Sequence, residues 1–232
     1  MPKLANLVTT KVTDVHRFQN YVNFLGAQNL KSFIIVRHPF HRLVSAFRDK
    51  LERSDLYYYK KHGQKIVAKY RHLFIDKFGE EYLSKVNNYG APIPVQDGHY
   101  KMNRSSLLPT FWEFVQYVKD TDPESMDEHW KPMHLFCPIC DVDFGYILKF
   151  ENVATEGKYL MNILSPSAKQ NLLDKVNVNH PKKINEMDLV AIYFNLLSES
   201  DIEALFKIYE FDFKMFDYEF IFNGKQYKKL AH

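Results

Sequence analysis

The first clear pattern of apolar positions lies between residues 32 and 53. Ser32 to Val36 is short, apolar and rich in β-branched residues, which predicts a buried strand. Pro39 follows at a position where a helix commonly begins, because the N–H that proline lacks would have no helical partner there. From about Phe40 to Arg53 the apolar residues fall on one face at helical spacing, which predicts an amphipathic helix.

Similar patterns predict elements along the rest of the chain. A second buried strand is expected at Tyr146 to Phe150, and Ser200 to Glu203 fits a capping box that opens a helix through Tyr209. We further expect helices at 13–29, 54–76, 111–118 and 153–163, a loop-rich stretch at 87–109, and an aromatic tail at 210–220 that packs onto the core. Strands that alternate with helices favour an α/β fold with a parallel sheet flanked by helices. No linker divides residues 1–232, so a single domain is expected.

The composition is that of an ordinary globular protein. The chain has 232 residues, of which 46% are hydrophobic and 25% charged, and this length is enough for one domain with a substantial core. No window approaches 18 uninterrupted apolar residues, which argues against a membrane-spanning segment in this sequence. The N-terminal residues show no apolar stretch of the kind that signal peptides carry.

The charge is unevenly distributed. The formal net charge is +3, yet the first 86 residues hold 16 Lys and Arg against 7 Asp and Glu, and the remainder is acidic. This asymmetry indicates an anionic ligand on the first half, although for the run from Lys60 to Arg71 a solvated charged surface remains the alternative. The aromatic tail has few interleaved Lys or Arg residues, so we expect no nucleic acid as a partner.

Arg37 stands where the predicted strand stops and the predicted helix starts. The start of a helix is a ready anion site, because its first N–H groups have no helical partner and its dipole is positive there. Arg37 can add a bidentate contact to a phosphate, and Ser45 within the helix can donate its hydroxyl to the same group. The alternative is that Arg37 pairs with a core carboxylate and Ser45 is only a small residue at a helix contact.

The string from Arg37 to Lys50, RHPFHRLVSAFRDK, closely resembles the 3′-phosphate-binding segment of the Golgi carbohydrate sulfotransferases. The closest branch contains the chondroitin and dermatan 4-O-sulfotransferases and the HNK-1 sulfotransferase. Three further segments resemble the pattern of this family in order and rough spacing, namely Asp127–Trp130, Leu135–Glu151 and Phe211–Tyr218.

The resemblance implies a P-loop-like sulfotransferase fold. It also implies transfer of a sulfuryl group from 3′-phosphoadenylyl sulfate (PAPS) to a hydroxyl of a glycosaminoglycan or related polyanionic glycan of the chondroitin or dermatan type. The residues expected to bind PAPS by this resemblance are Arg37, His38, Pro39, Arg42 and Ser45. A general base must take the proton of the acceptor hydroxyl, and His129 is the candidate. The alternative is a structural histidine beside Trp130. No metal is expected.

One departure from the family pattern affects these expectations. The family has an upstream motif, Pro-Lys-x-x-x-(Thr/Ser)-x-Trp-Lys, around the 5′-phosphosulfate, but Pro2-Lys3 is not followed by Thr-x-Trp-Lys. We therefore expect a partial sulfotransferase domain that is incomplete at its N-terminus, with the membrane anchor of these proteins absent from this chain. The resemblance implies a Golgi membrane location with a lumenal catalytic domain. The alternative function is a catalytically inactive nucleotide- or glycan-binding member of the same fold.

The two cysteines, Cys137 and Cys140, occur as CPIC. By ligand type alone they could form a zinc site with His129 and His134, although a second cysteine pair is absent. A disulfide is what the family resemblance implies. Asn103 begins an N-glycosylation sequon, which is consistent with a lumenal glycoprotein.

Overall fold

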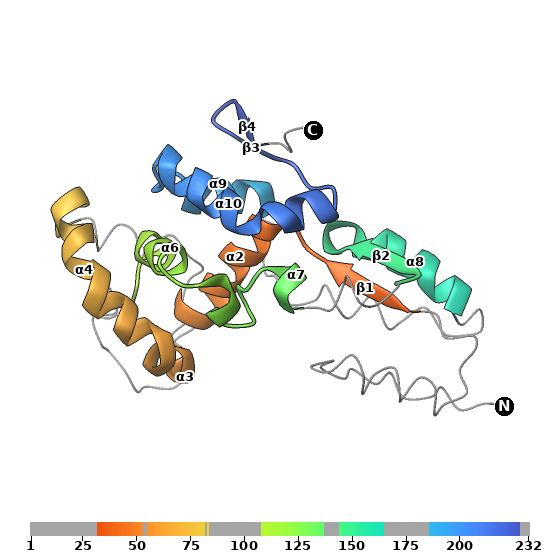
Figure 1. The fold of residues 1–232 in the computed structure, drawn as a ribbon, viewed down its shortest axis with the longest axis horizontal. Helices are drawn as coiled ribbons and strands as arrows, with labels where there is room; N and C mark the ends of the chain where they lie inside the picture. Colours follow the sequence, from red (N-terminus) through yellow and green to blue (C-terminus); the bar gives the residue numbers. More distant parts are fainter. Residues whose placement is uncertain are drawn as a thin grey trace.

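The structure is a computed structural model that describes residues 32–52, 55–81, 83, 108–136, 144–164 and 186–227 (Figure 1). The main elements in chain order are β1 (Phe33–Val36), α2 (Pro39–Phe47), α3 (Leu56–Tyr58), α4 (Gln64–Phe78), α6 (Phe111–Lys119), α7 (Met133–Phe136), β2 (Tyr146–Lys149), α8 (Val153–Leu164), α9 (Glu186–Phe194), α10 (Glu199–Met215), β3 (Phe220–Phe222) and β4 (Lys225–Tyr227). The helix expected at 13–29, the sequon at Asn103, and Cys137 and Cys140 lie outside the described residues.

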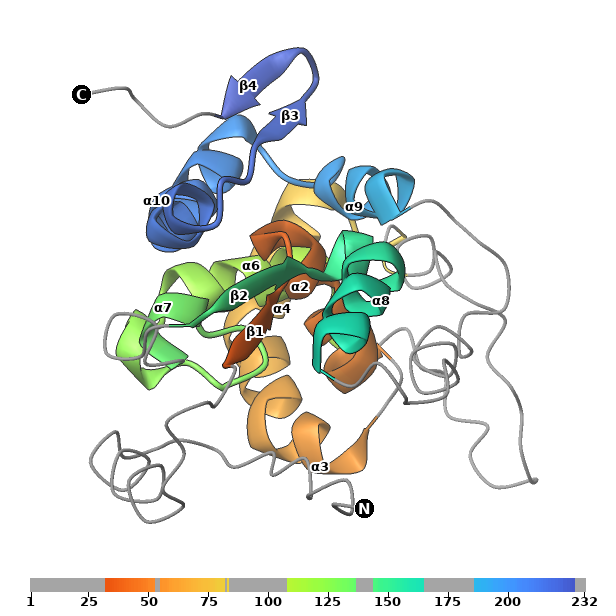
Figure 2. The ribbon, with the colours of Figure 1, turned by 90° about the vertical axis from the view of Figure 1, so that its right-hand side faces the viewer.

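β1 and β2 form a parallel two-stranded sheet in which Phe33 pairs with Tyr146 and Val36 with Lys149. Figure 2 shows this sheet between α7 and α8. Parallel strands need a crossover, and here the crossover contains the helices from α2 to α7. Both expected strands are therefore confirmed. The combination of helices with a parallel sheet is confirmed as well.

α2 follows β1 after two residues and is buried along one face. The helix expected through Arg53 continues after Phe47 as a π-helical turn, η1 (Arg48–Glu52). A second π-helical turn, η2 (Tyr59–Gly63), joins α3 to α4. The helices expected at 54–76, 111–118 and 153–163 are confirmed by α3 with α4, by α6 and by α8.

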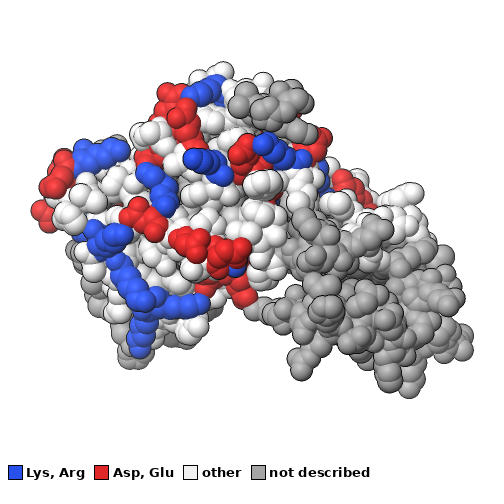
Figure 3. Space-filling view, viewed as in Figure 1, with Lys and Arg blue, Asp and Glu red and all other residues white. Residues whose placement is uncertain are grey.

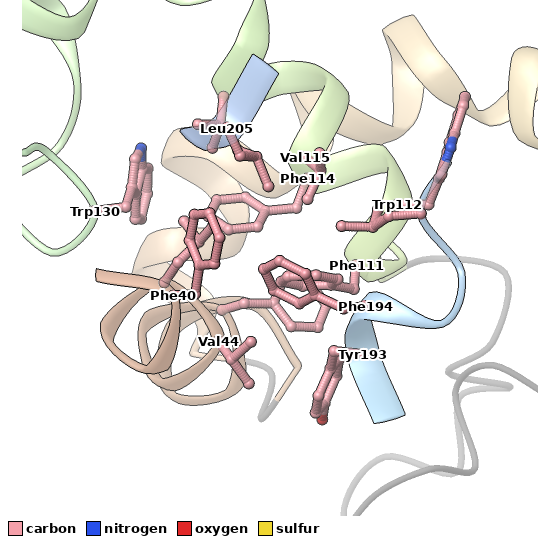
Figure 4. Close-up of a cluster of buried hydrophobic side chains, with 14 of the residues drawn as sticks. Phe40, Val44, Phe111, Trp112, Phe114, Val115, Trp130, Tyr193, Phe194 and Leu205 are labelled. Atoms are coloured by element: carbon pink, nitrogen blue, oxygen red, sulfur yellow. The ribbon is translucent and has the colours of Figure 1, made fainter. Parts of the chain in front are cut away.

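Aromatic side chains from α2, α6, α9 and α10 form the main core, part of which is shown in Figure 4. Phe40 of α2 is fully buried, and its ring centroid lies 4.9 Å from that of Phe194, 5.0 Å from Phe213 and 4.7 Å from Phe220. Each such aromatic pair contributes about 0.5–1.5 kcal/mol beyond the burial of its area. This packing fixes the buried face of α2 and therefore the direction of its opposite, polar face.

The C-terminal region corrects two expectations. The capping box is formed by Ser198 and Asp201 instead of Ser200 and Glu203: the Ser198 hydroxyl accepts from the Asp201 N–H, and the Asp201 carboxylate accepts from the Ser198 N–H. The helix that begins there runs to Met215, six residues beyond the expected end. Helical spacing explains why Phe213 is buried while Phe211 is 63% exposed, a difference that alternation along a tail does not give.

β3 and β4 form an antiparallel hairpin that sequence analysis did not predict. Its two-residue turn is Asn223-Gly224, and both residues have positive φ, 50° and 75°. Such a turn requires φ above zero at both positions, which Asn and Gly adopt most readily. The hairpin places Phe220 in the core.

Parts of the β1–β2 sheet stay open among the described residues. Ile34 and Val36 pack with Met133 and Phe216, whereas Ile35 and Ile147 are 41% and 52% exposed. A groove of about 370 Å³ lies between β2 and α8, lined by residues that include Leu148 and Tyr159. Within the part of the chain that the structure describes, none of the helices has the length and apolar content to cross a bilayer.

Candidate functional site

The corner between β1 and α2 is organised by His38, which is the N-cap of α2. Its Nδ1 accepts from the N–H groups of Phe40 and His41 at 3.2 and 3.5 Å, so Nε2 carries the hydrogen that is donated to the Glu219 carbonyl at 3.1 Å. Burial, together with the neighbouring charge of His41, lowers the pKa of His38 to about 3. His38 is therefore neutral near pH 7, and its ring stabilises the helix start that the sequence placed at Pro39.

Arg37 and Ser45 are placed by β1 and α2 respectively. Arg37 is the first residue after β1, half-buried, and its guanidinium carbon lies 4.8 Å from the centroid of the Phe150 ring, a cation–π distance. Ser45 lies two turns into α2 on its less buried face, which it shares with Arg42 and Arg48 because these residues recur every three positions. The structure thus places Ser45 on a polar face of the helix, away from the aromatic core.

Arg42 joins α2 to the turn that carries His129. Its Nη2 donates to the Glu128 carbonyl at 2.6 Å and its Nη1 to the Lys131 carbonyl at 2.5 Å. The planar guanidinium can make both bonds at once, a geometry that a lysine ammonium does not reproduce. The family resemblance implied that Arg42 binds the nucleotide. Its bonds to the His129 turn have no local sequence signal, because the two partners lie 86 and 89 residues away along the chain.

His129 is held by a buried carboxylate. Its Nδ1 lies 2.7 Å from Oδ1 of Asp127, whose side chain is only 3% exposed, and 3.2 Å from the hydroxyl of Tyr58. The Nδ1–H that donates to Asp127 leaves Nε2 as the acceptor of the neutral imidazole. Glu128 adjoins His129 in the sequence, but the carboxylate that contacts the imidazole is that of Asp127. A carboxylate that orients an imidazole in this way is typical of general bases.

Asp127 is also the centre of a wider cluster. Its Oδ2 lies 2.6 Å from Nζ of Lys61 and 3.3 Å from Nε2 of His62, both in η2. Although burial opposes ionisation, the hydrogen bonds from Lys61 and His129 hold the pKa of Asp127 well below its usual range. The carboxylate is therefore ionised at neutral pH and can stabilise a positive charge that forms on His129.

His134, which the sequence suggested as a possible zinc ligand, uses its Nδ1 elsewhere. That atom lies 2.7 Å from Oδ1 of the buried Asp212, which also accepts from the N–H groups of Met133 and His134. His129 and His134 are thus held by separate aspartates. Among the described residues, no group of three or more His, Cys, Asp and Glu side chains is arranged to hold a metal ion.

Exposed lysines lie beside the His129 cluster. Figure 3 shows Lys and Arg side chains gathered over the part of the molecule formed by α3 and α4. Lys61 pairs with Asp127 and Lys69 with Asp120, whereas Lys60 and Lys65 are exposed and have no carboxylate partner among the described residues. Carboxylates therefore neutralise part of the positive charge of the run from Lys60 to Arg71, and the remaining lysines are accessible to an anionic ligand.

The Glu151 carboxylate contacts the same strand-to-helix corner. One oxygen accepts from the His38 N–H at 2.9 Å and the other from the Tyr218 hydroxyl at 2.8 Å. Lys149 donates to the Asp217 carbonyl at 2.9 Å. Lys149 and Glu151 thus both bind the segment that follows α10.

Comparisons with known proteins agree with the motifs in the sequence. The profile of the sulfotransferase family matches residues 3–219, a range that contains both the Arg37 corner and His129. Human carbohydrate sulfotransferase 8 is 28% identical over 207 residues, which are 88% of this chain and 41% of that protein. Zebrafish carbohydrate sulfotransferase 14 is 25% identical over 203 residues, 88% of this chain and 45% of the relative.

Rat carbohydrate sulfotransferase 11 is 25% identical over 222 residues, 92% of this chain and 53% of that protein. The chain therefore spans roughly half the length of these relatives or less. No solved structure matches the chain. Because the family profile covers most of the sequence, including the β1–α2 corner and the His129 turn, the chain belongs to the sulfotransferase family.

Proposed function

We propose that this protein acts as a PAPS-dependent carbohydrate sulfotransferase that transfers a sulfuryl group to a hydroxyl of a chondroitin- or dermatan-type glycan. The observation that carries the proposal is the arrangement around α2. This helix presents Ser45 on its polar face, begins two residues after Arg37, and holds the His129 turn through Arg42. One rigid helix thus connects candidate donor-binding residues with a candidate base.

On the donor side, Arg37 and Ser45 bind the 3′-phosphate of PAPS in this proposal. A guanidinium and a hydroxyl are suitable groups, because the first gives a charge-assisted bidentate contact and the second a short hydrogen bond. Each contact to a charged phosphate contributes about 1.5–3 kcal/mol. Pro39 and His38 shape the corner: His38 caps the helix, and Pro39 begins it.

On the acceptor side, Nε2 of His129 takes the proton of the sugar hydroxyl while the hydroxyl oxygen bonds to the sulfur of the donor. The bond between that sulfur and the phosphate oxygen of the nucleotide breaks, and its electrons stay with the nucleotide. Asp127 holds the imidazole in the required tautomer and offsets the positive charge that it gains. The donor supplies the sulfuryl group, and no residue of this chain becomes covalently modified.

The acceptor is a polyanionic glycan in this proposal, and the basic surface supports it. Lys60 lies in η2, which also carries Lys61 of the Asp127 cluster, and Lys65 lies in the first turn of α4, which follows directly. Tyr57, whose side chain is 64% exposed, offers a ring on which a sugar face can pack. On the strength of the family resemblance, we also propose a Golgi membrane location with the catalytic domain in the lumen.

A transfer assay with sulfur-labelled PAPS and desulfated chondroitin tests the proposal. We expect label in the glycan with the wild-type chain and with His72→Ala, a control for an exposed histidine on α4, and a strong loss with Ser45→Ala. Binding of adenosine 3′,5′-bisphosphate without any transfer would favour the inactive binding member instead. Absence of both binding and transfer would contradict the proposed function altogether.

A further inference from the structure

Three consecutive residues at the end of β2 contact the strand-to-helix corner. Lys149 lies with its Nζ 4.6 Å from the Tyr218 ring centroid, Phe150 supports the Arg37 guanidinium, and Glu151 accepts from the His38 N–H. β2 pairs with β1 in parallel, so the residues that follow both strands emerge at the same edge of the sheet. The side chains after β2 are thereby brought against the residues after β1.

Glu151 is held at both of its oxygens. Oε1 accepts from the His38 backbone at 2.9 Å, and Oε2 accepts from the Tyr218 hydroxyl at 2.8 Å. The two donors lie 113 and 67 residues away, in β1–α2 and after α10. A carboxylate fixed by two donors from separate parts of the chain has little freedom to rotate.

Tyr218 completes this arrangement. Its hydroxyl also lies 3.4 Å from the Val36 carbonyl, and its ring packs edge-on against the His38 ring at 5.3 Å. Burial and the hydrogen bond to Glu151 raise the pKa of Tyr218, so the hydroxyl stays protonated and donates. The last residue of β1, the N-cap of α2 and the second residue after β2 all contact this tyrosine.

A carboxylate beside a phosphate site can act in two ways. It can compete with the phosphate for donors, or it can fix the groups that bind the phosphate. Competition would require release of Glu151, which would remove the acceptor of the N–H of the buried His38 and the shorter of the two contacts of the Tyr218 hydroxyl. Phe150, the neighbour of Glu151, meanwhile contacts the Arg37 guanidinium directly. The geometry favours the second role.

We propose that Glu151 and Tyr218 are positioning residues that fix the backbone on either side of Arg37 and so aim its guanidinium at the 3′-phosphate of the nucleotide. This inference rests on the proposed function, because it takes the 3′-phosphate as the ligand of Arg37. Neither residue is expected to touch the sulfuryl group or the acceptor.

Calorimetric titration of adenosine 3′,5′-bisphosphate tests the inference with Glu151→Gln and Tyr218→Phe. Asp76→Asn, an exposed carboxylate on α4, is the matched control for loss of one negative charge. We expect the Kd to rise about tenfold for each variant and to stay unchanged for the control. In the Arg37→Lys background we expect Glu151→Gln to raise the Kd only slightly further. A lysine ammonium has no planar, bidentate group whose direction the carboxylate could fix.

The outcomes separate this inference from the proposed function. Tighter binding by Glu151→Gln would show that the carboxylate competes with the phosphate, and unchanged binding would show that it has no part in the site; either result overturns the inference alone. An equal loss in the Arg37 and Arg37→Lys backgrounds would indicate a general structural role and would also overturn it. If the wild-type chain does not bind the bisphosphate, the proposed function fails and this inference with it.

Discussion

Acidification should destabilise this protein through the cap of α2. His38 has a pKa of about 3 in the folded chain, because it is buried and lies beside His41, whereas an unfolded histidine titrates near 6.5. Below pH 6.5 the unfolded chain therefore binds a proton that the folded chain does not bind. The contribution of the neutral His38 to folding stability is fully present above pH 6.5, and it is lost progressively as the pH falls from 6.5 towards 3.

The size of the effect follows from the two pKa values. When the pH falls from 7 to 5, proton binding to His38 in the unfolded chain lowers the free energy of unfolding by about 2 kcal/mol. The physical reason is that protonation puts a hydrogen on Nδ1, the atom that accepts from the Phe40 and His41 N–H groups. His38→Asn is the control, since an asparagine oxygen caps helices well and does not titrate.

Urea denaturation at pH 7 and pH 5 measures this prediction. Trp112 and Trp130 are 6% and 1% exposed, so their fluorescence reports unfolding of the core. Between pH 7 and pH 5, we expect the wild type to lose about 2 kcal/mol more of its unfolding free energy than His38→Asn loses. A difference that is the same at both pH values would refute the assigned role of the histidine ring.

Two further predictions concern the base and a buried ion pair. His129→Ala should lower kcat by roughly 10²- to 10⁴-fold in the labelled-sulfate assay, and Asp127→Asn should lower it by less. Both variants should bind the nucleotide with unchanged affinity. Full activity of His129→Ala would exclude His129 as the general base. Arg71→Met should lower the unfolding free energy by about 3–5 kcal/mol in urea, because it leaves the fully buried Glu113 without the guanidinium 2.6 Å away. Lys69→Met, which breaks an exposed pair on the same helix, should change it little, and equal effects of the two would contradict this reasoning.

The local elements near the site could be predicted from the sequence because local signals specify them. The apolar run at Phe33–Val36, Pro39 at the helix start and the amphipathic spacing up to Phe47 are visible without tertiary information. The hairpin was also visible in principle, because Asn223-Gly224 between aromatic residues is a strong turn signal. The capping box was misplaced by two residues because two overlapping Ser-x-x-acid strings begin at Ser198 and Ser200.

The contacts that assemble the site could not be predicted in the same way. The Tyr58 hydroxyl meets His129 across 71 residues, and Arg42 reaches the carbonyls of the same turn across nearly 90. No spacing rule encodes such pairs, because they depend on how α2 and α3 pack together with the turn after α6. The sequence therefore identified His129 as a residue of interest but missed Asp127 as the carboxylate that orients it.

The central claim is that the β1–α2 corner holds the 3′-phosphate of the nucleotide through Arg37 and Ser45. Calorimetry of adenosine 3′,5′-bisphosphate on the wild type, Arg37→Ala and Ser45→Ala tests it most directly, with Lys207→Ala on α10 as the control for loss of an exposed positive charge. We predict measurable binding by the wild type and the control, and a Kd at least about tenfold higher for both corner variants. Affinity that is unchanged in either corner variant would contradict the claim.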